Sequence, residues 1–566
     1  MDKPRSKSVP ENFRAATSKP ARTLDAIVIG AGLAGLYALH RLRGMGLSVR
    51  VLEAGSGVGG TWFWNRYPGC RCDVESMEYS YSFSNDLQQD WKWPERYGTQ
   101  PEILRYVNHV AERFDLMRDV QLNTRVRSAS FDSQANRWVV TTEHGEVYSA
   151  TYCVMASGNL STPRMPDNPG MDRFKGTFHH TGLWPKEGVD FTGLRVAVIG
   201  TGSSGVQSIP LIARQAKHLH VFQRTANFSL PARNAPLDTE KERRHKAEYP
   251  ARRRAAWETP FGIGGYPAPT CSALDMSAEE RERIYASKWQ EGGSISFLYA
   301  FTDLLTSKRA NDTAAEFVRQ KIRGIVRNPD VAETLAPKDH PIGTKRLCLD
   351  TEYYETYNRA NVTLVNARRT PIKEFTETGL KTSDAEYEFD AIVFATGFDA
   401  MTGALMEIDI RNGAGETLKD AWAGGPRTYL GVMVAGFPNM FLITGPQSPG
   451  VKTQMILSIE QHADWIAGCL AHLQSKGMNR VEAEQGAQDA WVEHVNQVAD
   501  KTLYPLANSW YMGANIPGKP RVFMPYVGGV PAYTRKVEEV VRKGYEGFVL
   551  ARCEAPAPAL SSSGSG

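Results

Sequence analysis

The sequence predicts an α/β protein with two Rossmann-like dinucleotide-binding domains and a helical insertion. Two segments that read as strand, glycine-rich loop and helix predict the two domains, at residues 25–43 and 195–214. A charged, helix-favouring stretch at residues 227–341 predicts the insertion. The chain of 566 residues is also longer than one hydrophobic core supports, so more than one domain is expected.

The domain boundaries follow from changes in these patterns. Strand patterning returns after the insertion and ends in a tight turn at Gly397, where we expect the chain to re-enter the first domain. We therefore expect a polar N-terminal lead-in over 1–24, a first domain over 25–158 and 391–552, a second domain over 159–226 and 342–390, the helical insertion over 227–341, and a flexible tail over 553–566.

The first glycine loop has the spacing that a dinucleotide pyrophosphate requires. Gly30 permits the tight turn after the strand, and Gly32 lets the backbone approach the phosphates. Gly35 lets the following helix pack on the strand, so that its N-terminus faces the phosphates. Glu53 ends the next strand and can accept hydrogen bonds from free ribose hydroxyls, which suits FAD or NAD. The alternative interpretation is a glycine-rich turn with an incidental surface glutamate.

The second glycine loop has the same spacing as the first, but a different residue occupies the position that would contact the ribose. It consists of Gly200, Thr201, Gly202, Ser203, Ser204 and Gly205. The position equivalent to Glu53 is Gln223, followed by Arg224 and Thr225. A guanidinium and a hydroxyl at this strand end suit a 2′-phosphate, so the loop predicts NADPH in preference to NADH. Two such sites in one chain indicate hydride transfer from NADPH to FAD.

Cysteine usage and charge exclude several classes of function. The seven cysteines are scattered, and the nearest pair, Cys70 and Cys72, has neither the redox nor the zinc spacing, so both are interpreted as packing residues. A disulfide reductase and a metal site are therefore not predicted. The net charge of +4 is too balanced for nucleic-acid binding, and no apolar run is long enough to cross a membrane. With no secretory h-region, we expect a cytoplasmic protein.

One further segment carries a family signature. Residues 174–185 fit the pattern FxGxxxHxxxWP at every fixed position, which are Phe174, Gly176, His180, Trp184 and Pro185. With the segments at 59–62, 64–69, 73–76, 343–346, 395–399 and 509–511, the chain resembles the Baeyer–Villiger monooxygenases over roughly residues 25–550. Among these type I flavoprotein monooxygenases, it is most similar to the phenylacetone and steroid monooxygenase branch.

The resemblance implies a reaction and its principal residues. NADPH would reduce FAD, O₂ would add to form a flavin C4a-peroxide, and this would convert a cyclic, aromatic or steroid-like ketone to an ester or lactone. Arg346 matches the family arginine beside the flavin, and its permanent cation would stabilise developing negative oxygen. Asp73 matches the aspartate that positions this arginine. The family also implies a monomer.

The resemblance assigns further cofactor and linker residues. Those on the side of the first nucleotide are Gly60, Thr61, Trp62, Asp73 and Tyr79. Lys345 joins Arg224 and Thr225 around the 2′-phosphate. Trp510 matches a tryptophan on a mobile segment over the nicotinamide nucleotide, although an ordinary core tryptophan is the alternative. The signature around His180 is expected to act as a hinge that couples domain motion to turnover, and not as an acid or base.

A loop that lines the substrate in relatives departs from their usual pattern here. Its predicted substrate residues are Gly450, Val451, Lys452 and Met455. Lys452 takes a position that is commonly apolar, so substrate preference does not transfer from the relatives. Met455 faces either the pocket or the core.

Two alternative functions are also compatible with the sequence. The same reduced flavin and O₂ could oxygenate sulfur or nitrogen instead of a ketone. A redox-silent protein that binds NADPH and regulates a partner is the other alternative, against which the presence of both Asp73 and Arg346 argues.

Overall fold

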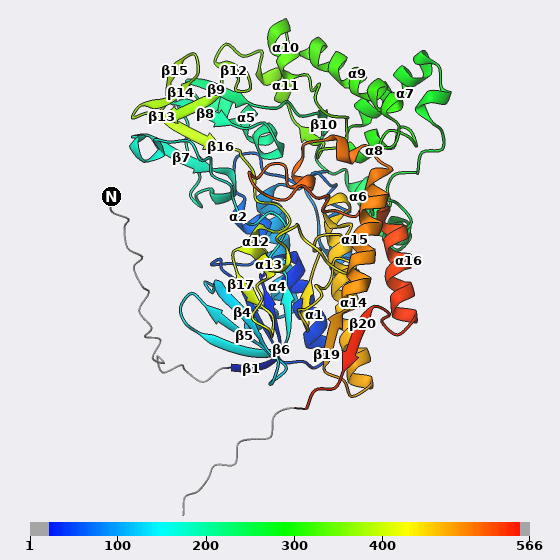
Figure 1. Cartoon of the computed structure of the whole chain (residues 1–566). Coiled ribbons are helices and arrows are strands. Elements are labelled where there is room, and N and C mark those ends of the chain that lie inside the picture. Colours follow the sequence, from blue (N-terminus) through cyan, green and yellow to red (C-terminus); the bar gives the residue numbers. More distant parts are fainter. Residues whose placement is uncertain (1–21, 555–566) are drawn as a thin grey trace, which may run out of the picture.

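A computed structural model of the chain describes residues 22–554 and shows two domains, one built on a mixed sheet and the other on a parallel sheet (Figure 1). The predicted polar lead-in at 1–21 and the end of the predicted tail at 555–566 lie outside the described residues. Residues 22–24 were expected in the lead-in but already belong to the first strand, β1 (Arg22–Ile29). Arg22, Thr23 and Leu24 lengthen β1 at its N-terminal end because they pair with residues of β6 (Val147–Met155).

The first sheet holds the first glycine loop. Its strand order is β17-β4-β5-β6-β1-β2-β3, and β18 also pairs with β6. The half of β1 from Ala26 to Ile29 is wholly buried, because Ala26 and Val28 pack in one apolar cluster and Ile27 and Ile29 in another, so that both faces of the strand are covered. The remaining strands are β2 (Val49–Leu52), β3 (Val120–Gln121), β4 (Val126–Asp132), β5 (Arg137–Thr142), β17 (Asp409–Arg411) and β18 (Met440–Leu442).

The second sheet holds the second glycine loop and lies in the upper left of Figure 1. Its order is β12-β9-β8-β16-β7, with every pair parallel. The strands are β7 (Thr177–His180), β8 (Arg195–Ile199), β9 (His218–Gln223), β12 (Val362–Asn366) and β16 (Ala391–Phe394). A small antiparallel sheet of β13 (Ile372–Phe375), β14 (Gly379–Thr382) and β15 (Glu386–Glu388) adjoins it.

The pairing of β16 corrects the predicted boundary at residue 391. We expected Ala391 onward to belong to the first domain, but β16 pairs with β7 and β8 of the second sheet. The four residues of β16 are fully buried, so their apolar run is equally compatible with either sheet. The turn at Gly397, which has a φ of +80°, comes after this strand, so the chain leaves the second sheet only there.

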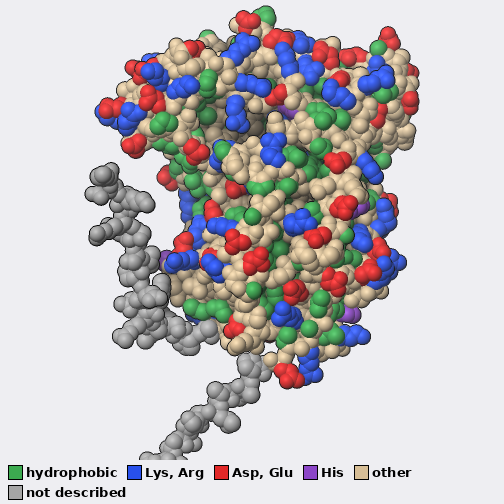
Figure 2. All heavy atoms as spheres, in the orientation of Figure 1, with side chains coloured by type: hydrophobic (Ala, Val, Ile, Leu, Met, Phe, Trp, Pro, Cys, Tyr) green, Lys and Arg blue, Asp and Glu red, His purple; other side chains and the backbone are tan. Residues whose placement is uncertain are grey.

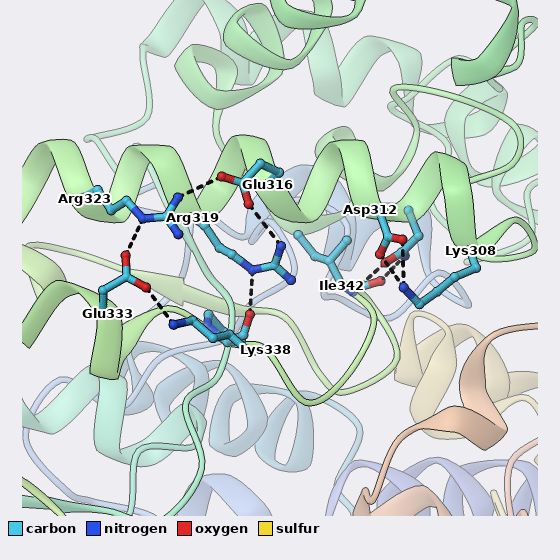
Figure 3. Close-up of polar contacts among 10 residues, drawn as sticks. Lys308, Asp312, Glu316, Arg319, Arg323, Glu333, Lys338 and Ile342 are labelled. Atoms are coloured by element: carbon cyan, nitrogen blue, oxygen red, sulfur yellow. Dashed lines mark hydrogen bonds and ion pairs between the residues drawn. The ribbon is translucent and has the colours of Figure 1, made fainter. Parts of the chain in front are cut away.

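The predicted helical insertion is largely helical in the structure. It contains α6 (Thr239–Trp257), α7 (Ala278–Glu291), α8 (Ser294–Leu298), α9 (Lys308–Ile325) and α10 (Pro329–Leu335). A short strand, β10 (Ser229–Pro231), enters it and pairs with β11 (Cys348–Asp350) where the chain leaves. Figure 3 shows the ion pairs that join α9 to α10 and the residues after it. Arg323 of α9 donates to Glu316 and Glu333, and Lys338 also donates to Glu333.

The remaining helices connect these layers. The long ones are α1 (Leu33–Gly44), α4 (Gln100–Arg113), α5 (Ser203–Gln215), α14 (Met455–Ser475), α15 (Gln485–Asp500) and α16 (Gly529–Arg542). The short ones are α2 (Thr61–Trp64), α3 (Asn85–Asp90), α11 (Tyr353–Thr356), α12 (Gly403–Met406) and α13 (Leu418–Ala421). Near the C-terminus, β19 (Arg480–Ala483) and β20 (Phe548–Ala551) form an antiparallel pair.

The surface carries mixed charge. Figure 2 shows Lys and Arg side chains interspersed with Asp and Glu over the visible face. Within residues 22–554, no helix is both long enough and apolar enough to cross a membrane.

Candidate active site

The first glycine loop forms a close-packed backbone cradle. A Cβ added to Gly35 would lie 1.8 Å from the carbonyl oxygen of Gly30, so only glycine allows α1 to approach β1 this closely. Gly32 faces Gly60 across the loop, and a Cβ on Gly60 would lie 2.9 Å from the Cα of Gly32. Backbone of two separate segments therefore meets at the N-terminus of α1, as a pyrophosphate site requires.

Glu53 lies under this cradle at the end of β2. Its side chain is buried, and its two carboxylate oxygens accept hydrogen bonds from the backbone N–H of Ala31 and of Gly55, each at 2.7 Å. These bonds fix the carboxylate while leaving each oxygen able to accept a ribose hydroxyl. The position therefore fits a nucleotide with free ribose hydroxyls and opposes a 2′-phosphate.

An aromatic pair lies beside the first cradle. Trp62, on α2, donates its indole N–H to the hydroxyl of Tyr79 at 3.1 Å, and the two rings meet edge to face. Burial raises the pKa of the Tyr79 phenol well above its ordinary value, so this group is neutral at physiological pH. Thr61 is exposed at the first turn of α2. Thr61 and Trp62 therefore follow Gly60 directly, and Tyr79 is held beside them by Trp62.

The second glycine loop has a tightly packed turn at Gly200 and Gly205, and unfilled space beside Gly202. A Cβ on Gly205 would lie 2.4 Å from the carbonyl oxygen of Gly200, the same helix-on-strand contact as in the first loop. A Cβ on Gly202, in contrast, would meet no protein atom within 4 Å. Gly202 and Ser203 are exposed at the N-terminus of α5, where backbone N–H groups favour phosphate. Ser204 accepts a hydrogen bond from Thr181 at 3.2 Å.

The two glycines of this loop give a matched test of nucleotide binding. Gly202→Ala is expected to raise the KM for NADPH about tenfold or more and to leave thermal unfolding unchanged, because its φ of −80° suits alanine and only a ligand would meet the methyl group. Gly205→Ala should instead lower the thermal unfolding temperature through its clash with Gly200. An unchanged KM in Gly202→Ala would contradict a pyrophosphate at this loop.

Cations gather at the ribose end of the second loop. Gln223 is buried and donates its amide N–H to the carbonyl of Thr334 at 2.7 Å, so no carboxylate occupies the strand end. Arg224 is exposed next to it. Burial lowers the pKa of Lys345, the Asp339 carboxylate raises it, and the positive charges of Arg224 and Arg368 lower it further, so both cations act on this ammonium. Such a cluster favours a dianionic group.

Arg346 and Asp73 form a bidentate pair, as the family resemblance implied. The Nε and Nη2 groups of Arg346 donate to the two carboxylate oxygens of Asp73, each at 2.6 Å, and Nη1 donates to the carbonyl of Val451 at 2.9 Å. Burial raises the pKa of Asp73, but the charge and hydrogen bonds of Arg346 outweigh it and hold this pKa below its ordinary value. Asp73 is therefore ionised and fixes the plane of the guanidinium.

This pair lies where the two nucleotide-binding units meet. Gly69, four residues before Asp73, packs so closely on α5 that an added Cβ would lie 2.5 Å from the carbonyl oxygen of Gln207. Cys348, two residues after Arg346, contacts the Ser203 hydroxyl of the second loop at 3.5 Å. The guanidinium is therefore anchored between a segment that follows the first loop and one that touches the second.

The predicted substrate loop is adjacent to the pair. Gly450, Val451 and Lys452 form one turn of 3₁₀ helix, and the partly buried Met455 begins α14 and packs against a buried apolar cluster. The Lys452 ammonium lies 4.2 Å from the ring centre of Tyr504 and 4.4 Å from that of Tyr511. The lysine thus lies between two aromatic faces and next to the residue whose carbonyl binds Arg346.

The family signature packs closely against the second sheet, in which His180 ends β7. A Cβ on Gly176 would lie 2.5 Å from the carbonyl oxygen of Asp390, and Phe174 and Trp184 are buried. Nδ1 of His180 accepts the backbone N–H of Gly182 at 2.9 Å, so Nε2 carries the proton and donates to Thr396 at 3.3 Å. Burial lowers the pKa of His180, which keeps the ring neutral in this structural role.

Some of the residues around the pair were not singled out from the sequence. Tyr504 and Tyr511 contact Lys452, whereas the predicted Trp510 packs on Tyr511 with ring centres 4.2 Å apart. The segment containing Trp510 and Tyr511 was part of the family pattern, but only Trp510 was named as a site residue from it. No sequence signal marks Tyr504, because its contact depends on long-range packing. The lid role of Trp510 stays a prediction.

The fold and the two nucleotide loops define an oxidoreductase with two dinucleotide-binding domains. A family model described as pyridine nucleotide-disulphide oxidoreductase matches residues 27–236. A Baeyer–Villiger monooxygenase from Pseudooceanicola batsensis is 44% identical over 93% of this chain and 96% of its own length. The chain belongs to the Baeyer–Villiger monooxygenase family.

Solved structures agree with this assignment. An oxidised steroid monooxygenase bound to NADP is 52% identical and superimposes with a TM-score of 0.89, covering 94% of this chain and all of the other. A complex of OTEMO with FAD and NADP is 42% identical, with a TM-score of 0.90 and the same coverage of both chains.

Proposed function

We propose that the protein uses FAD, NADPH and O₂ to insert one oxygen atom between the carbonyl carbon of a ketone and its neighbouring carbon. The balanced reaction consumes one ketone, one O₂, one NADPH and one proton, and yields one ester or lactone, one NADP⁺ and one water. Membership of the Baeyer–Villiger family supports the reaction class. The observation that carries the proposal is the Arg346–Asp73 pair at the junction of the two nucleotide loops.

The described residues fit both cofactors. FAD would occupy the first loop, with its pyrophosphate at the N-terminus of α1 and a ribose on Glu53. NADPH would occupy the second, with its pyrophosphate over Gly202 and its 2′-phosphate near Arg224 and Lys345. When bound, FAD supplies the redox chemistry that passes electrons from NADPH to O₂.

Arg346 would stabilise negative charge at the reacting oxygen atoms. Its guanidinium stays protonated throughout, because Asp73 beside it raises the pKa of an already basic group. Asp73 and the carbonyl of Val451 together accept from Nε, Nη1 and Nη2, so the cation is held in one orientation before substrate arrives. A pre-oriented cation in a partly desolvated site stabilises an oxyanion without reorganisation during the reaction.

Further features of the proposal concern organisation. We propose that the first domain comprises 22–158 and 395–552, and that the signature around His180 transmits motion between it and the second domain. The protein is proposed to work as a cytoplasmic monomer on a small ketone. The seven cysteines are unpaired, as a reducing compartment favours.

The proposal is tested by the stoichiometry of turnover. The FAD-loaded protein is given NADPH, air and a panel of cyclic, aromatic and steroid ketones, and products are separated by gas chromatography. One ester or lactone per NADPH oxidised is the expected result. NADPH oxidation that yields only hydrogen peroxide with every ketone would reject it. A sulfide or amine that outcompetes every ketone would support heteroatom oxygenation instead.

A further inference from the structure

Lys452 is the charged side chain of the predicted substrate loop that the reaction does not require. It ends the 3₁₀ turn Gly450–Lys452, directly after the residue whose carbonyl accepts from Arg346 at 2.9 Å. The charges of Arg346 and Asp73 both act on its pKa, so the ammonium lies within electrostatic reach of the pair. Lys452 is partly exposed, and it therefore lies beside the groups that would hold the reacting carbonyl.

The positive charge of Lys452 has no carboxylate of its own. Among residues 22–554 its ammonium makes no ion pair, and its polar contact is the Tyr511 hydroxyl at 3.4 Å. Asp73 is the carboxylate whose charge acts on the pKa of Lys452, but both of its oxygens accept hydrogen bonds from Arg346. Lys519 on the neighbouring segment shows the usual arrangement, because it is paired with Asp399.

The two tyrosines around Lys452 do not supply the missing negative charge. Burial raises the pKa of Tyr511 to about 12, and it raises that of Tyr504 further, so both phenols are neutral at physiological pH. Their rings hold the ammonium by cation–π attraction at 4.2 and 4.4 Å. Burial and the charge of Arg346 lower the pKa of Lys452 well below its ordinary value, and the Asp73 carboxylate only partly opposes them. An anionic ligand beside Lys452 would raise this pKa and so favour the charged ammonium.

We infer that Lys452 is a specificity residue that binds an anionic group on the substrate, so that the preferred ketones carry a carboxylate. The inference rests on the proposed function, because the Arg346–Asp73 pair marks where the ketone would react. A carboxylate would pair with the ammonium, while Tyr504 and Tyr511 would provide an apolar wall for the carbon chain of the substrate. Arg224 and Lys345 would bind the 2′-phosphate of NADPH, whereas Lys452 would bind the substrate.

The inference is tested with pairs of ketones that differ only in charge. The FAD-loaded enzyme is assayed with 4-oxopentanoate, 5-oxohexanoate and 6-oxoheptanoate and with the methyl ester of each, in saturating NADPH. For at least one chain length, kcat/KM for the acid should exceed that for the ester. Lys452→Gln should lower this acid-to-ester ratio about tenfold or more, through KM, whereas Lys452→Arg should keep most of it.

A binding measurement and a matched control complete the test. Hexanoate, which has no ketone, should inhibit oxidation of a neutral ketone competitively, and its Ki should rise about tenfold in Lys452→Gln. Lys501→Gln removes the same charge from an exposed position at the end of α15 and should change neither value. The KM for NADPH should be unaffected in every variant.

Three outcomes would overturn the inference or its basis, and they can be told apart. An acid-to-ester ratio that is the same in wild type and Lys452→Gln would reject the carboxylate site. A raised KM for NADPH in Lys452→Gln, with the ratio unchanged, would reject it in favour of a cofactor contact. If no acid, ester or cyclic ketone is oxygenated while hexanoate binding still depends on Lys452, the anion site stands and the proposed function fails.

Discussion

Arg346→Ala is expected to lower ketone oxygenation by about a hundredfold to a thousandfold, while NADPH still reduces the bound flavin. The loss follows because removal of the guanidinium takes away the pre-oriented cation that opposes developing negative charge. Reduction by NADPH depends on the two nucleotide loops, which this substitution leaves in place. Steady-state product formation and anaerobic flavin reduction, measured on the same preparation, separate the two effects.

Two related variants show whether charge or geometry matters at this pair. Arg346→Lys keeps a cation but makes only one of the two bonds to Asp73, so it should recover little activity. Asp73→Asn keeps the shape of the partner but removes the charge that orients the guanidinium, and should give an intermediate loss. Bound FAD and thermal unfolding serve as controls for folding. Ketone turnover in Arg346→Ala within about tenfold of wild type would contradict the assigned role.

Replacing Arg224 and Lys345 together with alanine should lower kcat/KM for NADPH about a hundredfold or more and leave that for NADH nearly unchanged. Each charge-assisted hydrogen bond to a 2′-phosphate contributes roughly 1.5–3 kcal/mol, and NADH has no phosphate to lose. The effect should be larger for the pair than for Arg224 alone, because Lys345 is half-buried and its pKa is sensitive to both Arg224 and Arg368.

The matched control for this switch is Arg359→Ala. This arginine is exposed and contacts Asn361, away from the glycine loop, so its removal should not change the preference between the two nucleotides. The preference is measured as the ratio of kcat/KM values for NADPH and NADH with one ketone. Equal losses for both nucleotides in the double variant would show that these cations do not read the 2′-phosphate.

The nucleotide loops could be predicted because their constraints are local. Gly30, Gly35 and Glu53 lie within one strand–helix–strand unit, and the structure shows the close contacts and hydrogen bonds that their spacing implies. The Arg346–Asp73 pair joins residues 273 positions apart, so no local pattern specifies it. It was predicted from the family resemblance, and the bidentate geometry agrees with that prediction.

The errors and omissions concern long-range packing. The boundary at Ala391 was wrong because a buried apolar strand has the same sequence pattern in either of two sheets, and only its pairing with β7 and β8 distinguishes them. The contacts of Lys452 with Tyr504 and Tyr511 were missed for a similar reason, since they join a loop to a segment about fifty residues later.

Incorporation of ¹⁸O from ¹⁸O₂ tests the central claim most directly. The FAD-loaded enzyme is supplied with NADPH, ¹⁸O₂ and a ketone that it turns over, and the product is examined by mass spectrometry. The account predicts one ¹⁸O atom in each ester or lactone formed, with the second ¹⁸O released as water. Product that contains no ¹⁸O, or labelled hydrogen peroxide with the ketone unchanged, would contradict it.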